Sequence, residues 1–209
     1  LGKVLYRGAL LEISYQDWAE LGTADHLLGS YRLAGSFRVD TIIADPTGRL
    51  ARLQAVVGRG FPERVWIRRR CADARRTIEH RLAGFDPAQP LHQQVTRWLF
   101  GTGGTAHLPL VAALRTPTVR LRYLAAREAL VGYGYGDRYP DLLALLGCAQ
   151  WSAEQADQHL AELGRTFDAT AAVATTPFFF SSDLTAPARP IAIDGSRDLI
   201  AQGNHREAV

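Results

Sequence analysis

Glu12 is the residue whose position best suits chemistry, because it places a carboxylate within an apolar stretch. The residues around it alternate as a strand does, with Leu11 and Ile13 on the face opposite to Glu12. A glutamate in a strand is unfavourable unless its face is wet or holds a cation. Two interpretations stay open: an exposed edge face, or a carboxylate that binds a metal ion or acts in catalysis.

Other arrangements with catalytic meaning are missing from the sequence. It contains no Gly-x-Ser-x-Gly elbow, no phosphate loop ending in Gly-Lys-Ser/Thr and no cluster with metal-ligand spacing. The two cysteines, Cys71 and Cys148, are far apart, which argues against a disulfide scaffold and fits a reducing compartment. His92 is isolated at the start of an expected helix, where a histidine is more often a surface or core residue than a ligand.

One stretch imitates a known metal-binding signature. Gly29 and Ser30 precede Asp40, as in the order Gly-Ser, helix and then a strand bearing Asp-x-Asp, whose two carboxylates hold Mg²⁺. Here Thr41 and Ile42 follow Asp40, so the second acid is missing. Asp45 lies on the opposite side of the strand that we expect over residues 37–44. The preferred interpretation is that this stretch is not a metal site.

Charge is spread unevenly along the chain. Residues 59–81 carry eight arginines and three acids, whereas residues 141–209 carry nine acids and four arginines. The net charge of +3 is too small to argue for nucleic acid or an anionic membrane as the partner. The arginines could grip phosphates, but an exposed helix face explains them without a ligand. The apolar stripe of that expected helix, residues 62–84, consists of Ile67, Cys71, Ala74, Ile78 and Leu82, and Arg68, Arg69, Arg75 and Arg76 lie off it.

Residues 89–115 are the most apolar long segment, and the other elements are expected to pack around them. Leu91, Val95 and Trp98 recur at helical spacing, and residues 107–114 are apolar almost all round. The Thr-Gly-Gly-Thr sequence at 102–105 is expected to break or bend the helix. We interpret the segment as the central helix of a bundle.

The whole pattern predicts a mainly α protein: a helical bundle preceded by a short β-hairpin that turns at Gly8-Ala9. The expected domains are residues 1–46 and 47–209. No apolar run reaches the ~18 residues of a membrane span, and no signal peptide opens the chain, so we expect a cytoplasmic protein. The chain begins at Leu1 and contains no methionine, which suggests the ordered part of a longer protein.

Residues 8–21, 28–50, 98–104 and 176–200 resemble bacterial nucleotidyltransferase-domain proteins. These belong to the DNA polymerase beta superfamily, alongside the aminoglycoside adenylyltransferases. The resemblance implies an α+β domain with a small sheet ahead of a helical bundle, so the hairpin is expected to be a remnant of that domain. This chain departs from the family because the upstream Gly-Ser and Asp-x-Asp motif is not in it.

By this resemblance, Glu12 is the third carboxylate, which positions Mg²⁺ or deprotonates an acceptor hydroxyl. His92 and Gln93 are expected to line the acceptor side of the cleft. The implied activity is Mg²⁺-dependent transfer of a nucleoside monophosphate from a nucleoside triphosphate to a hydroxyl group. The expected partners are the triphosphate and a small-molecule acceptor, with a homodimer as an option and no membrane.

Two alternatives remain. The chain could be a noncatalytic helical module that binds a small molecule or a protein partner. A weaker alternative is a regulatory domain whose residues 59–81 bind nucleic acid with a steep salt dependence, although nucleic acid is not an expected partner.

Overall fold

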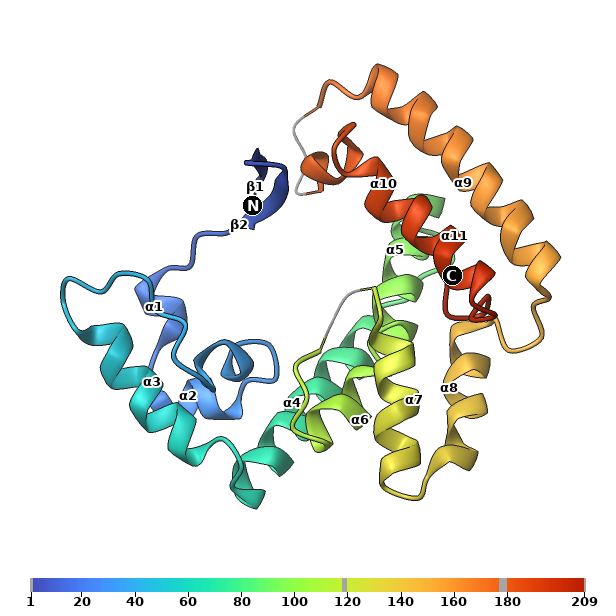
Figure 1. Cartoon of the computed structure of the whole chain (residues 1–209). Coiled ribbons are helices and arrows are strands. Elements are labelled where there is room, and N and C mark those ends of the chain that lie inside the picture. Colours follow the sequence, from blue (N-terminus) through green and yellow to red (C-terminus); the bar gives the residue numbers. More distant parts are fainter. Residues whose placement is uncertain (1, 118–119, 177–179, 209) are drawn as a thin grey trace. The chain divides into compact units, whose positions relative to one another are not determined.

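The computed structural model describes residues 2–117, 120–176 and 180–208, and it is mainly helical with a small two-stranded sheet at the N-terminal end (Figure 1). This confirms the predicted fold class. The elements are β1 (Gly2–Tyr6), β2 (Ala9–Ile13), α1 (Trp18–Leu21), α2 (Ala24–Gly29), η1 (Ala34–Phe37), α3 (Arg49–Gly60), α4 (Arg64–Ala83), α5 (Leu91–Thr102), α6 (His107–Ala112), α7 (Arg122–Gly132), η2 (Gly136–Arg138), α8 (Tyr139–Leu146), α9 (Ala153–Val173), η3 (Ser181–Leu184), α10 (Arg189–Ala192) and α11 (Asp194–Ala201).

The hairpin forms as predicted, but its turn lies one residue earlier. Tyr6 pairs with Ala9, so Arg7 and Gly8 are the two turn residues. Both have positive φ, 48° for Arg7 and 81° for Gly8, as a type I′ turn requires. Glycine therefore occupies the second turn position and not the first, because it accommodates the larger positive φ without steric cost.

The chain divides into two compact units. One contains residues 1–16 with 148–209, and the other contains residues 17–147. The expected domain boundary after residue 46 lies inside the second unit, between η1 and α3. The hairpin belongs to the same unit as the C-terminal helices, a pairing of chain ends that local sequence patterns do not reveal.

In the unit of residues 17–147, α4 is one of the elements that several others share. It packs against α2, α5 and α6. Its Ala74 belongs to a buried cluster with Tyr31 and Val111. A second cluster joins α2 to α3 through Leu27, Leu28 and Val57. The expectation that residues 89–115 form the centre holds in part, because α5 and α6 contact α4, α7 and α8, whereas α4 is the helix that reaches α2.

The segment of residues 89–115 does bend at its glycines, as predicted, giving α5 and α6. Its second half is more enclosed, with Leu110 and Val111 buried. Its first half is less enclosed, since Leu91 is 73% exposed and Val95 and Trp98 are also exposed. The apolar stripe of α5 is therefore directed away from the core of its unit, and close packing begins only at Gly101.

The strand expected over residues 37–44 does not form. Phe37 ends the 3₁₀ helix η1, and the residues up to Gly48 are loop. The side chain of Asp40 accepts a hydrogen bond from the Ile42 amide, 3.1 Å away, which is a local turn contact. The Asp45 carboxylate accepts a bond from the Ala51 amide at 3.0 Å and so stabilises the start of α3. Local hydrogen bonds of these aspartates therefore prevail over strand propensity.

Arg70 is a buried charge on α4 that the apolar pattern did not indicate. Its side chain is 2% exposed and donates to the Leu28 carbonyl at 3.1 Å and to the Phe61 carbonyl at 2.7 Å. The guanidinium also lies 4.2 Å from the centre of the Phe61 ring. Burial lowers the pKa of Arg70. These contacts connect the ends of α2 and α3 to α4.

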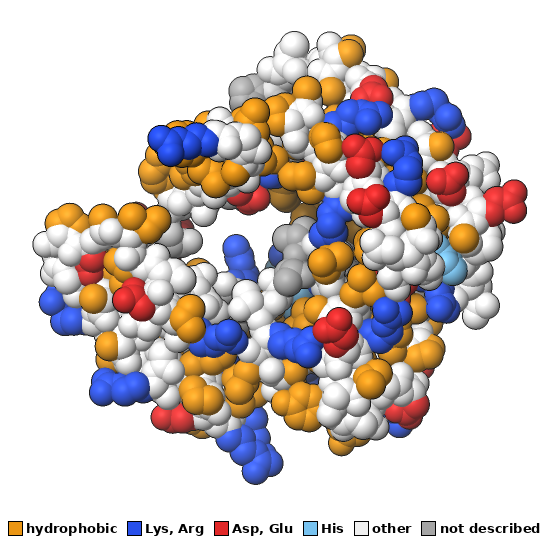
Figure 2. All heavy atoms as spheres, viewed as in Figure 1, with side chains coloured by type: hydrophobic (Ala, Val, Ile, Leu, Met, Phe, Trp, Pro, Cys, Tyr) orange, Lys and Arg blue, Asp and Glu red, His pale blue; other side chains and the backbone are white. Residues whose placement is uncertain are grey.

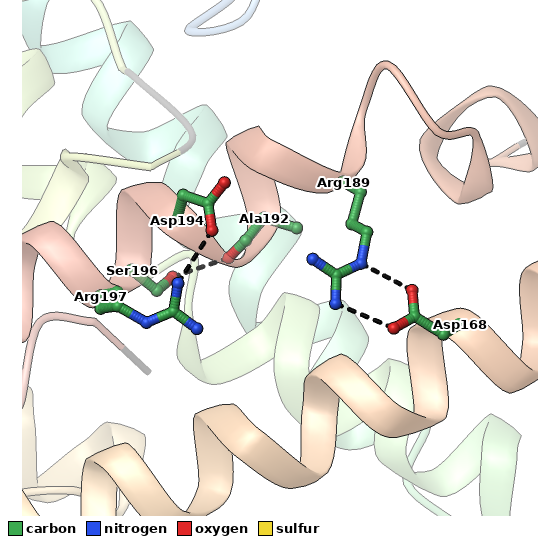
Figure 3. Close-up of polar contacts among 6 residues, drawn as sticks. All are labelled: Asp168, Arg189, Ala192, Asp194, Ser196 and Arg197. Carbon is green, nitrogen blue, oxygen red and sulfur yellow. Dashed lines mark hydrogen bonds and ion pairs between the residues drawn. The ribbon is translucent and has the colours of Figure 1, made fainter.

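In the other unit, α9 packs against α11, and an ion pair joins α9 to α10. Asp168 accepts two hydrogen bonds from Arg189, at 2.6 and 2.8 Å (Figure 3). The paired guanidinium lowers the pKa of Asp168. Figure 3 also shows Arg197 bonded to Asp194 within α11. The N-terminus of α9 has a capping box formed by Ser152 and Gln155.

On the face drawn in Figure 2, basic and acidic side chains are intermixed, with apolar side chains exposed between them. No helix among the described residues is long and apolar enough to span a membrane.

Candidate functional site

Glu12 lies on β2 directly opposite Lys3 of β1. Its carboxylate is 3.9 Å from the Lys3 ammonium, and its side chain is 54% exposed. The same ammonium contacts Asp183 of η3, and the Lys3 side chain is largely buried by these neighbours. Lys3 therefore links both strands of the hairpin to the C-terminal segment of the same unit.

This neighbourhood does not fit a magnesium ion. The charged group nearest to Glu12 in these contacts is an ammonium, which would compete with a metal ion for the carboxylate. Across residues 2–117, 120–176 and 180–208, no group of three or more histidine, cysteine or acidic side chains could hold a metal ion. Glu12 as a catalytic and metal-binding residue stays a prediction, and no reaction step is derived from it.

His92 and Gln93 lie in the first turn of α5, and both side chains are exposed. They are neighbours in the unit of residues 17–147, whereas Glu12 belongs to the other unit. The structure therefore does not define a site that the three predicted residues share. Their role in acceptor binding stays a prediction.

A cavity of about 460 Å³ lies elsewhere in the unit of residues 17–147, where α2 meets α4. Thr23 caps α2 by accepting a bond from the His26 amide at 3.2 Å. Buried Leu27 and Leu28 fix the inner face of this short helix. The cavity is lined by Asp25, His26, Gly29, Ser30, Arg69, Ala72, Asp73 and Arg76.

The α4 side of the cavity follows from helical geometry. Arg69, Ala72, Asp73 and Arg76 are separated by three, one and three residues, which places all four on one face of a helix. The apolar pattern places the two arginines off the stripe but does not group them with Asp73. The polar i, i+4, i+7 spacing was the signal that could have identified this face.

Asp73 is fixed by its own unit. One carboxylate oxygen accepts a bond from the Tyr31 amide at 3.2 Å, and the other lies 3.3 Å from an Arg76 nitrogen. The first bond ties the chain just after α2 to α4, so it holds the two walls of the cavity in place. The second partly neutralises Arg76.

Arg69 and Asp25 differ from Asp73 and Arg76 in the contacts that their side chains make. The Arg69 guanidinium lies over the Trp66 ring, 4.7 Å from its centre, and this contact orients it. Within the described part of the chain, neither Arg69 nor Asp25 forms a side-chain hydrogen bond or an ion pair. The cavity thus presents one guanidinium and one carboxylate that can each bind a ligand.

Comparisons with family models, curated proteins and solved structures gave no match to this chain. The resemblance to nucleotidyltransferase-domain proteins is supported only by the stretches of sequence that carry it. The cavity and its side chains are therefore the observations that bear on function.

Proposed function

We propose that this chain is a helical module that binds a small polar molecule in the cavity between α2 and α4. The observation that carries the proposal is a cavity of about 460 Å³ in which two arginines, two aspartates, a histidine and a serine converge. Cavities that bind small molecules commonly measure ~300–1,000 Å³ and orient the ligand with a few polar groups. The polar lining favours a charged or hydroxylated ligand over an apolar one.

Rigid walls support this proposal, because a preformed site loses less entropy when a ligand binds. The Tyr31–Asp73 hydrogen bond connects the segment after α2 to α4. Arg70 connects the Leu28 carbonyl of α2 to the same helix from its buried side. Both contacts are made by the unit itself, so the cavity exists before any ligand enters.

The test is an NMR titration of the ¹⁵N-labelled chain with a defined panel: carboxylic acids, amines, amino acids, phosphate monoesters and nucleotides. Binding in the cavity is expected to shift the amide signals of residues 25–30 and 69–76. Ala72→Phe should fill the cavity and abolish those shifts. Ala83→Phe, at the exposed end of the same helix, is the matched control and should leave them unchanged.

Two results would overturn the proposal. One is a panel in which no compound shifts the cavity amides. The other is a compound that binds Ala72→Phe as tightly as the unaltered chain, since the ligand would then lie elsewhere.

The nucleotidyltransferase activity remains a prediction supported by the resemblance. Gly29 and Ser30, which imitate the start of its signature, do line the cavity, but Asp40 is held in a local turn. The prediction requires heat on titration with Mg-ATP, reduced in Glu12→Gln and unchanged in Glu154→Gln on α9. Absence of heat in the unaltered chain contradicts it.

A further inference from the structure

The positive and negative side chains that line the cavity between α2 and α4 are equal in number, and this balance limits the class of its ligand. Its lining contains two arginines, Arg69 and Arg76, and two aspartates, Asp25 and Asp73. Arg76 and Asp73 are 3.3 Å apart and already neutralise each other. Asp73 also accepts the Tyr31 amide, so each of its carboxylate oxygens already has a partner within the unit.

The two remaining charges come from opposite walls. Asp25 belongs to α2 and Arg69 belongs to α4. They line the same cavity, yet among the described residues no ion pair joins them. Opposite charges that line one cavity without forming an ion pair can each bind a different group of the same ligand.

We infer that the ligand is a small dipolar molecule, with an anionic oxyacid group that binds Arg69 and a protonated amine that binds Asp25. This inference rests on the proposed ligand-binding function and names its ligand class. The planar guanidinium of Arg69, held over Trp66, suits a carboxylate or phosphate. Ser30 supports the site as well: its oxygen accepts the Leu33 amide, which leaves the hydroxyl proton to donate.

Singly charged ligands are disfavoured by the same geometry. A simple anion at Arg69 would share the cavity with the uncompensated carboxylate of Asp25, and a simple amine would share it with the uncompensated guanidinium of Arg69. Like charges in one cavity repel, so a singly charged ligand loses part of the binding free energy that its one ion pair provides. A dipolar ligand in the correct orientation pairs with both residues.

The test is a calorimetric and NMR titration with ω-amino acids of increasing chain length, from glycine to 6-aminohexanoate. Each is compared with the carboxylic acid and the amine of the same length. At the chain length that fits, the amino acid is expected to bind about fivefold more tightly than either singly charged analogue, the size expected of one exposed charge pair.

Variants assign the two ends of the ligand. Asp25→Asn should weaken amino-acid binding about fivefold and leave binding of the carboxylic acid of the same length unweakened. Arg69→Gln should weaken amino-acid binding by a similar factor and leave binding of the amine of the same length unweakened. Arg68→Gln on α4 and Asp137→Asn in η2 are controls of the same charge change outside the cavity, and both should bind normally.

The outcomes separate this inference from the proposed function. Two results would contradict a dipolar ligand: the carboxylic acid binds as tightly as the amino acid of the same length, or both cavity variants bind the amino acid normally. Neither result contradicts ligand binding between α2 and α4. If no ω-amino acid shifts the cavity amides, the dipolar ligand is likewise wrong. The cavity itself is then judged by the remaining compounds of the panel and by Ala72→Phe.

Discussion

At the scale of single residues, burial determines the properties of two titratable side chains, Arg70 on α4 and His107 on α6. Arg70 sits among apolar residues because two backbone carbonyls, those of Leu28 and Phe61, accept its protons. His107 is half-buried, and its ring centre lies 5.9 Å from that of Tyr31. Neither role follows from residue type, because an arginine or histidine on a helix is usually exposed.

Arg70→Met should destabilise the unit of residues 17–147 by ~2–4 kcal/mol, because two buried carbonyls would lose their donors. Urea denaturation followed by circular dichroism measures the change. Arg68→Met, at an exposed position of the same helix, should change stability by no more than ~0.5 kcal/mol. Equal effects of the two substitutions would contradict the role assigned to Arg70.

His107 should make stability depend on pH. Burial, with the nearby charges of Arg122 and Arg81, lowers its pKa from 6.5 to about 4. The unfolded chain therefore binds this proton more readily, so the stabilising effect is complete above about pH 6.5 and is lost as the pH falls towards about 4. The total loss is ~3 kcal/mol, since each pKa unit corresponds to ~1.4 kcal/mol.

Denaturation curves at a series of pH values measure this loss. His107→Gln should flatten the dependence across that interval, whereas His92→Gln, at the exposed start of α5, should retain it. Parallel curves for the unaltered chain and His107→Gln would show that the proton binds elsewhere.

At the scale of elements, the junction between α5 and α6 depends on close approach of the backbone. Gly101, Thr102, Gly103 and Gly104 are all buried. A Cβ atom at Gly103 would lie 2.6 Å from the Leu99 carbonyl oxygen, which is closer than real contacts allow. The glycines thus act by omitting a side chain where α5 ends. The sequence indicates the position of this bend but not the close backbone contact that requires it.

Gly103→Ala should therefore destabilise the chain by ~1–3 kcal/mol, because a backbone atom cannot move aside as a flexible side chain can. Gly132→Ala, at the end of α7 where nothing lies within 4 Å, should be neutral or slightly stabilising. Thermal melts of both variants make the comparison. A Gly103→Ala variant as stable as Gly132→Ala would refute the close-approach argument.

At the scale of the whole molecule, the chain forms two compact units, and one of them is discontinuous. Residues 17–147 are a single segment that contains both buried clusters described above. Residues 148–209 form a unit with the hairpin of residues 1–16, to which Lys3 contributes its contact with Asp183. A two-stranded hairpin is marginally stable alone, so it depends on that partner segment.

Residues 17–147 expressed alone should fold, because their apolar cores and the α2–α4 cavity are internal to them. The expected result is a cooperative thermal melt and an NMR spectrum that overlays that of the same residues in the whole chain. Residues 148–209 alone lack the hairpin and should melt with less cooperativity. A disordered 17–147 segment would show that the unit needs the rest of the chain.

The sequence by itself determined the helices, the hairpin and the bend after α5, since these depend on local spacing of apolar residues, caps and glycines. It did not determine which face of α5 is covered, because exposed Leu91 and Val95 carry the same periodic signal as buried side chains. It also placed Arg69 and Arg76 off the apolar face without showing what lies opposite them. Only the tertiary structure brought Asp25 of α2 to the same cavity, because residues more than 40 positions apart meet through packing and long-range hydrogen bonds such as Tyr31–Asp73, for which a single sequence carries no local pattern.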